Sequence, residues 1–99
     1  MLNISKESDG SALTVILEGR LDTSTAPSLE EALKDGLNDV TSLVFDLKEM
    51  QYISSAGLRV LLSAQKVMNK QGSMLIKNAS EQIKEIFDVT GFSEILTIE

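Results

Sequence analysis

The sequence has no cysteine, no histidine and no tryptophan, and only one proline and four aromatic residues in all. Without cysteine there is no disulfide framework, no thiolate nucleophile and no cysteine-ligated metal. Without histidine the chain lacks the usual general base, the most common zinc ligand and any phosphohistidine residue. We therefore expect no enzymatic activity, no metal site and no cofactor.

The chain also lacks an excess of positive charge and any long apolar stretch. Nine Lys and Arg residues stand against fifteen Asp and Glu, so the net charge of −6 opposes binding to nucleic acid or to an anionic membrane. No stretch approaches the roughly 18 apolar residues of a membrane span. The first residues are not a basic segment followed by an apolar one, as in a secretion signal. We expect a cytoplasmic protein that contacts neither nucleic acid nor a membrane.

What the chain does have is the composition of a single globular domain. Its 99 residues are 42% hydrophobic and 24% charged, which is enough to bury a core and leaves no room for a second domain. We therefore expect residues 1–99 to form one domain.

Turn signals and apolar periodicity predict alternating strands and helices. Strands are expected at residues 2–5, 12–18, 42–47 and 74–77, and helices near 26–38, from 54 or 55 to about 70, and from 81 to about 89. The first two strands form a hairpin around Asp9-Gly10-Ser11, and the nearly continuous apolar run at 42–47 suits a central strand covered on both faces. Ser80 caps the last helix, Gly91 ends it, and the apolar tail packs back with Phe92, Ile95, Leu96 and Ile98. This order predicts an α/β layer fold with a mixed sheet.

The helix at about 55–70 separates polar and apolar residues sharply. At about 100° per residue, one narrow stripe contains only polar side chains, namely Ser55, Arg59, Ser63, Lys66 and Lys70. Leu58 and Leu62 flank this stripe, and the opposite side carries Ala56, Val60, Leu61, Ala64, Val67 and Met68. This segment has three positive charges and no acid, so the other 83 residues together carry a charge of −9, which gives the net charge of −6. A stripe of this kind most often only faces water.

Two adjacent serines, Ser54 and Ser55, start this helix. Serine at a helix start is most often a cap that accepts a backbone N–H bond. The same position also tolerates a phosphate, because free backbone N–H groups and the helix dipole point toward it. Gly57 alone is a weak phosphate-loop signal, and we expect it to allow a close approach to another backbone.

Three segments together resemble a known family. They are Glu18-Gly19-Arg20-Leu21-Asp22-Thr23-Ser24-Thr25-Ala26-Pro27, Val44-Phe45-Asp46-Leu47 and Tyr52-Ile53-Ser54-Ser55-Ala56-Gly57-Leu58-Arg59-Val60-Leu61-Leu62. In this order they resemble the anti-sigma factor antagonist family, the stand-alone bacterial STAS domain, over essentially the whole chain. The resemblance implies a curved mixed sheet with helices packed against one side, and no catalysis.

The resemblance also implies a mechanism and partners. The unmodified protein would bind an anti-sigma factor that is a serine kinase with an ATP-binding fold, and this would free the sigma factor for transcription. Phosphorylation of a serine would break the complex, and a metal-dependent serine phosphatase would restore it. The protein itself would be a monomer, and the ATP would belong to the partner.

Site residues are carried over by position. The phosphorylated serine falls on Ser55, with Ser54 as second choice, because Ser54 stands where the family often has Asp. Asp22 matches an acidic position near the acceptor and is equally well read as an ordinary turn residue. The expected partner contacts are Asp22, Ser54, Ala56, Gly57, Leu58, Arg59, Leu62 and Lys66, with Leu58 or Leu62 as an apolar anchor. Leu62 is equally well read as a residue that seals the helix against its neighbour.

Other functions remain open at this stage. The main alternative is a STAS adaptor without phosphorylation, in a larger assembly for lipid transport or stress signalling. A small hydrolase using Ser55 with Asp22 or Asp46 lacks a base near the motif. An acyl-carrier role fits the acidic charge but not the many strands or the missing Asp-Ser-Leu motif.

Overall fold

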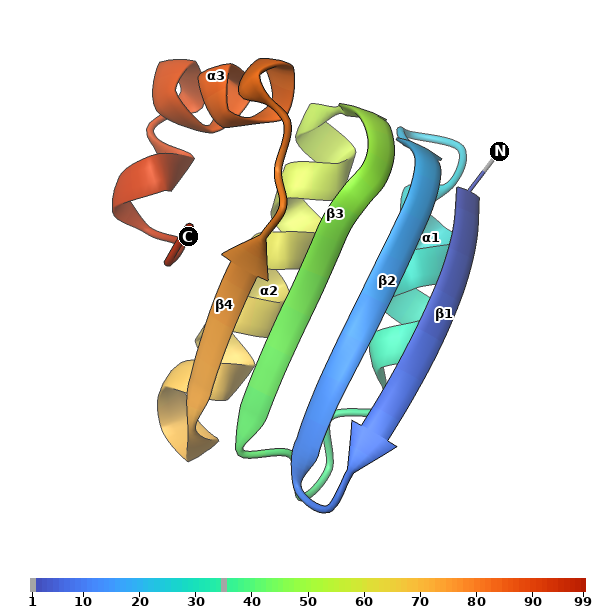
Figure 1. The fold of residues 1–99 in the computed structure, drawn as a ribbon, viewed down its shortest axis with the longest axis vertical. Coiled ribbons are helices and arrows are strands. Elements are labelled where there is room, and N and C mark those ends of the chain that lie inside the picture. The colour runs from blue at the N-terminus through green and yellow to red at the C-terminus, as the bar shows by residue number, and fades with distance from the viewer. Residues whose placement is uncertain (1, 35) are drawn as a thin grey trace.

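The computed structural model describes residues 2–34 and 36–99, which form one sheet with helices packed against it (Figure 1). The strands are β1 (Leu2–Asp9), β2 (Ala12–Leu21), β3 (Ser42–Ile53) and β4 (Ser73–Lys77). The helices are α1 (Ala26–Lys34), α2 (Ser55–Gln71) and α3 (Glu81–Thr90), followed by a short 3-10 helix, Phe92–Glu94. This order confirms the predicted alternation of strands and helices.

The sheet is mixed, with the strand order β1-β2-β3-β4. β1 and β2 form the predicted antiparallel hairpin, in which Asp9 lies opposite Ala12. β2, β3 and β4 run parallel, since a helix connects each strand to the next. The β2–β3 register shifts twice near the end of β2, and β3 curves over at the same end (Figure 1). The parallel strands therefore end at one edge of the sheet, where α1 and α2 begin.

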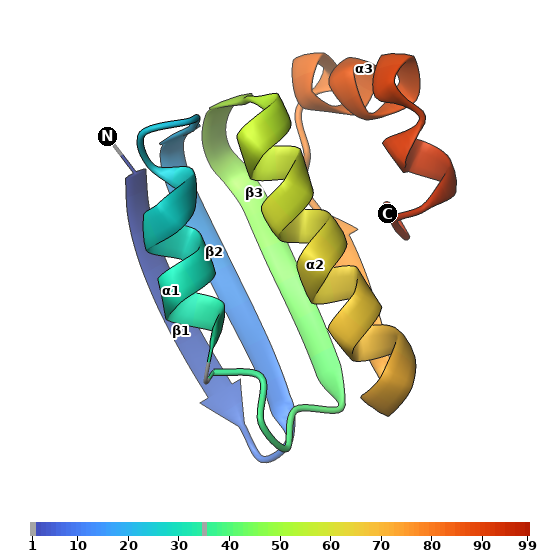
Figure 2. The same ribbon diagram turned by 180° about the vertical axis from the view of Figure 1, so that it is seen from behind.

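Both α1 and α2 lie on one face of the sheet (Figure 2). Alternate strand residues point toward them and are buried, including Leu17 on β2 and Phe45 and Leu47 on β3. Their neighbours on the other face, such as Val44, are only half-buried, and no helix in the described part of the chain covers that face. The expectation of a central strand covered on both faces was wrong. The apolar Val44 makes the run look continuous although only one side of it is in the core.

Three strands continue beyond their predicted ends, including β2, which continues to Leu21. β1 continues to Asp9 because its whole length pairs with β2. β3 continues to Ile53, and its extension buries Met50 and Ile53 on the helix side. This extension brings the end of β3 directly to the start of α2.

α1 is shorter than predicted and ends at Lys34. The predicted range 26–38 includes residue 35, which lies outside the described residues. Lys6 on β1 donates from its Nζ to the carbonyl oxygen of Ala32 at 2.7 Å, and this is the carbonyl that a continued helix would use. Leu37, expected on the helix, is buried in the turn that follows it.

α3 and the tail pack beside β4 at the far edge of the sheet (Figures 1 and 2). Ser80 accepts a hydrogen bond from the Ile83 N–H at 3.2 Å, and Gly91 ends the helix with a φ of 82°, as predicted. Leu96 is buried and Ile98 forms a parallel bridge with Ile76, whereas Ile95 is 49% exposed and does not pack as expected. No helix within the described residues combines the length and the apolar character that crossing a membrane requires.

Candidate functional site

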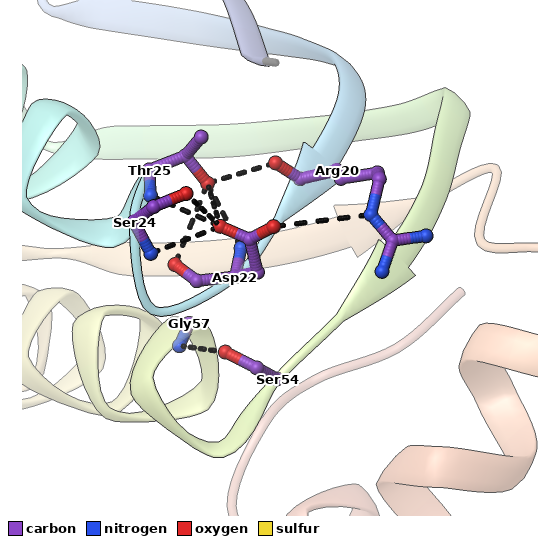
Figure 3. Close-up of polar contacts among 6 residues, drawn as sticks. All are labelled: Arg20, Asp22, Ser24, Thr25, Ser54 and Gly57. Atoms are coloured by element: carbon purple, nitrogen blue, oxygen red, sulfur yellow. Dashed lines mark hydrogen bonds and ion pairs between the residues drawn. The ribbon is translucent and has the colours of Figure 1, made fainter.

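The start of α2 is fixed by Ser54, which is the N-cap residue. Its backbone is extended (φ −99°, ψ 175°), and its hydroxyl accepts a hydrogen bond from the Gly57 N–H at 3.4 Å (Figure 3). The Ser54 N–H donates to the carbonyl of Leu21 at 2.8 Å, which joins the helix start to the end of β2. The hydroxyl of Ser54 is thus engaged in capping.

Ser55 is the first residue of α2 and is exposed. Its hydroxyl makes no hydrogen bond within residues 2–34 and 36–99. The first turn of α2 contains no acidic residue, so no side chain there offsets the positive end of the helix dipole. An anionic group on Ser55 would therefore lie in a favourable electrostatic position.

The predicted polar stripe of α2 is exposed along its whole length. Its members are Ser55, Arg59, Ser63, Lys66 and Lys70. Ala56 and Leu62 border it and are half-buried, so part of each remains accessible. The face that α2 presents to solvent is therefore basic, with a small apolar margin.

Three expectations for α2 were wrong. Leu58 is only 4% exposed, so it belongs to the core and cannot anchor a partner at the surface. Gly57 is also buried, and a Cβ on it would lie 2.7 Å from Leu21 Cγ and 3.0 Å from Ile53 Cγ1, so the close approach is to side chains rather than to backbone. Val67, expected in the core, is 40% exposed because it borders a cleft between α1 and α2.

Asp22 organises the turn between β2 and α1. Its Oδ1 accepts hydrogen bonds from the Ser24 hydroxyl at 2.7 Å, the Ser24 N–H at 3.0 Å and the Thr25 N–H at 3.1 Å (Figure 3). The hydrogen bond from the Ser24 hydroxyl is the main cause that holds the pKa of Asp22 below its usual value. The two N–H bonds also lower this pKa, whereas partial burial raises it. Asp22 is therefore an ionised carboxylate in a fixed orientation.

Arg20 and Tyr52 form a contact that sequence reasoning missed. They are register partners on β2 and β3, and the Arg20 guanidinium carbon lies 4.5 Å from the centre of the Tyr52 ring. Arg20 Nε is also 3.8 Å from Asp22 Oδ2 (Figure 3). Their positions in the sequence could have indicated this contact. Arg20 stands two residues before the predicted site residue Asp22, and Tyr52 stands two residues before Ser54. The pairing of β2 with β3 is what places Arg20 beside Tyr52.

Among the described residues, no three His, Cys, Asp or Glu side chains lie together in a group that could hold a metal ion.

Comparisons with known proteins agree on the family. The STAS domain model matches residues 3–99. An anti-sigma-B factor antagonist of Bacillus subtilis is 32% identical over 98 residues, which cover 98% of this chain and 90% of that protein. The crystal structure of an anti-sigma factor antagonist from Mycobacterium paratuberculosis superposes with a TM-score of 0.89, at 22% identity and with 99% and 85% of the two chains covered. The Bacillus protein SpoIIAA in its phosphorylated form gives a TM-score of 0.76, at 15% identity over 98% and 91% of the chains. The chain therefore belongs to the anti-sigma factor antagonist family of STAS domain proteins.

Proposed function

We propose that this chain is an anti-sigma factor antagonist that works by partner switching. In its unphosphorylated form it binds an anti-sigma factor that is also a serine kinase with an ATP-binding fold, and this frees a sigma factor for transcription. Its membership of the family and the name of its relative in Bacillus subtilis support this proposal. The protein acts by binding rather than by catalysis, as a cytoplasmic monomer of one domain, and the ATP belongs to its partner.

The observation that carries the proposal is the difference between the two adjacent serines. Ser54 uses its hydroxyl as the N-cap of α2, whereas Ser55 is exposed with its hydroxyl free of bonds to the described residues. A kinase can therefore modify Ser55 without removing the cap. We assign Ser55 as the phosphate acceptor and keep Ser54 as the second choice.

A phosphate on Ser55 would change the surface more than the fold. It would add a charge of about −1.5 to −2 beside the positive end of α2, where it stabilises the helix start. Arg59 lies one turn further along the same exposed stripe and can pair with it. A partner shaped to the unmodified face would then meet new charge and bulk, and its binding would end. That SpoIIAA, which shares the fold, has been solved in phosphorylated form is consistent with this reasoning.

The face that we propose for the partner surrounds Ser55. It comprises the accessible members of the predicted set: Asp22, Ser54, Ala56, Arg59, Leu62 and Lys66. Arg59 and Lys66 supply charge, and Leu62 supplies a half-buried apolar contact. A metal-dependent serine phosphatase would restore the binding form by removing the phosphate.

Phosphosite mapping tests the proposal. Protein recovered from its own cells is analysed by mass spectrometry for the wild type, Ser55→Ala and Ser54→Ala, with Ser80→Ala, the N-cap of α3, as matched control. We expect phosphate on Ser55, its loss in Ser55→Ala and its retention in the other two variants. Phosphate only on Ser54 would move the acceptor by one residue. Absence of phosphate under several growth conditions would contradict the switch and favour the constitutive adaptor.

A further inference from the structure

A cleft lies beside the start of α2, between the end of β3 and α3. The volume of this open cleft is about 520 Å³. Its apolar lining includes Tyr52, Ile86 and Val89, and its polar rim includes Gln51, Glu85 and Thr90. Tyr52 precedes the cap residue Ser54 by two positions, so the cleft adjoins the proposed partner face.

The cleft concentrates apolar surface that the fold leaves uncovered. Within the described residues, four large hydrophobic side chains are exposed, and two of them, Val89 at 80% and Tyr52 at 37%, line this cleft. Exposed apolar surface gathered in one hollow and bordered by polar residues is typical of an interaction site. Val89 contributes little to the core, so its apolar character is not explained by packing.

Arg20 adds a positive group whose position is already fixed. Its guanidinium lies over the Tyr52 ring at 4.5 Å, and only its Nε approaches Asp22, at 3.8 Å. The side chain is 52% exposed, and its two terminal amino groups have no hydrogen-bond partner among residues 2–34 and 36–99. A guanidinium held in this way can bind a carboxylate through two parallel bonds without losing much side-chain freedom.

We propose that Arg20 and this cleft form a docking site for a segment of the anti-sigma factor that carries a carboxylate next to an apolar side chain. The carboxylate pairs with the free amino groups of Arg20, and the apolar side chain enters the cleft between Tyr52 and Val89. This inference rests on the proposed function and extends the partner face from α2 across Ser54 to α3. Arginine and tyrosine are among the residue types that dominate binding energy at interfaces. An Asp or Glu at this point would make Arg20 a determinant of partner specificity.

The test uses the purified serine kinases with the ATP-binding fold from the organism of this chain, each titrated calorimetrically into the unphosphorylated wild type. The kinase that binds is then titrated into Arg20→Glu, Arg20→Lys and Val89→Asp. Val67→Asp is the matched control, because Val67 is also an exposed valine on a helix but lines a different cleft. Thermal unfolding is recorded for every variant to show that each one folds.

We expect Arg20→Glu and Val89→Asp to weaken binding by about 30-fold or more, since like charges or a buried carboxylate then face the partner. The affinity of Arg20→Lys for the kinase should lie between those of Arg20→Glu and the wild type, and the affinity of Val67→Asp should equal that of the wild type. Replacing one Asp or Glu of the kinase by Arg should restore binding to Arg20→Glu. If a kinase binds the wild type but Arg20→Glu and Val89→Asp bind within twofold of it, the docking site is wrong while the proposed function stands. If no kinase binds the wild type, the proposed function fails and this inference with it.

Discussion

Two helices of this protein begin with the same local chemistry and differ in what they expose. α2 is capped by Ser54, whose hydroxyl accepts from Gly57 N at 3.4 Å, and α3 is capped by Ser80, whose hydroxyl accepts from Ile83 N at 3.2 Å. Both cap residues have extended backbones. By the geometry of the cap alone, the two helix starts are equivalent.

The residue after each cap makes the difference. In α3 it is Glu81, an acid in the first turn that offsets the positive helix end. In α2 it is the neutral Ser55, and the first turn has no acid. At the start of α3 a carboxylate therefore offsets the positive end of the helix dipole. The start of α2 has no such negative charge, and it exposes a hydroxyl that could be phosphorylated. The two helix starts therefore differ in charge and in their exposed hydroxyl, although their caps are alike.

The largest expected effect concerns this difference directly. Phosphorylation of Ser55 should lower affinity for the anti-sigma factor by about 3 kcal/mol, roughly 150-fold, measured by calorimetry on the unmodified and modified protein. The comparison is sharpened by Glu81→Ser, which gives α3 the same pair of serines. The kinase should leave α3 of this variant unmodified, since position 81 is neither among the proposed partner contacts nor in the lining of the docking cleft. Phosphate incorporated equally into both helices would show that the local sequence, not the surface, directs the kinase.

Adding a methyl group to the third residue of α2 and removing one from the third residue of α3 should both lower stability. Gly57→Ala should lower the free energy of unfolding by about 2 kcal/mol, because the new Cβ meets the buried Leu21 and Ile53 side chains. At the equivalent position of α3, Ile83→Val removes a methyl group from the core and should cost about 1 kcal/mol. Urea unfolding at constant m-value measures both. An unchanged midpoint for Gly57→Ala would mean that the start of α2 is less tightly packed than its contacts indicate.

The two caps themselves should contribute equally. Ser54→Ala and Ser80→Ala should each lower stability by about 1 kcal/mol, a fall in Tm of about 4–8 °C for a domain of this size. Neither substitution should prevent phosphorylation of Ser55. A Ser54→Ala protein that is as stable as the wild type would show that the 3.4 Å bond does not stabilise the helix start, and would remove the structural reason for placing Ser54 second to Ser55 as the acceptor.

The smallest effect concerns pH at the turn beside α2. Because hydrogen bonds hold the pKa of Asp22 below its usual value of 3.8, its carboxylate stabilises the folded state above about pH 4, and this contribution is lost as the pH falls through the lowered pKa. Between about pH 5 and pH 2, the wild type should therefore lose more stability than Asp22→Asn. Parallel curves for the two proteins would show that the Ser24 and Thr25 bonds do not favour the charged form.

Local features were predictable from the sequence because their causes are local. The hairpin at Asp9-Gly10, the cap at Ser80 and the stop at Gly91 each depend on residues within one or two turns of the chain. The same holds for the polar stripe of α2, which follows from helical periodicity alone. The serine pair was found in this way, and the family resemblance placed Ser55 before Ser54; the cap hydrogen bond of Ser54 is a structural argument for the same order.

Other features depend on neighbours that periodicity cannot supply. Leu58 was placed at the edge of the stripe, yet Gln65 on the same side of α2 is only 7% exposed, so the buried arc is wider there than the pattern predicts. Val67 faces the opposite edge, where α1 and α2 leave a cleft of about 340 Å³. The Arg20–Tyr52 contact joins residues far apart in the chain through the β2–β3 register, which no local signal encodes.

The far end of α2 has a consequence for how a signal can leave the site. Gln71 Nε2 donates to the carbonyls of Leu37 at 2.6 Å and Val40 at 2.7 Å, and Ser73 N–H donates to Thr41 at 2.9 Å. A Cβ on Gly72 would lie 1.9 Å from the Thr41 oxygen, so the chain passes this point with no room to shift. Sliding α2 along its axis would break these bonds together. α2 is thus held in place at its C-terminal end, so a phosphate on Ser55 would have to act on a partner directly rather than through movement of the helix.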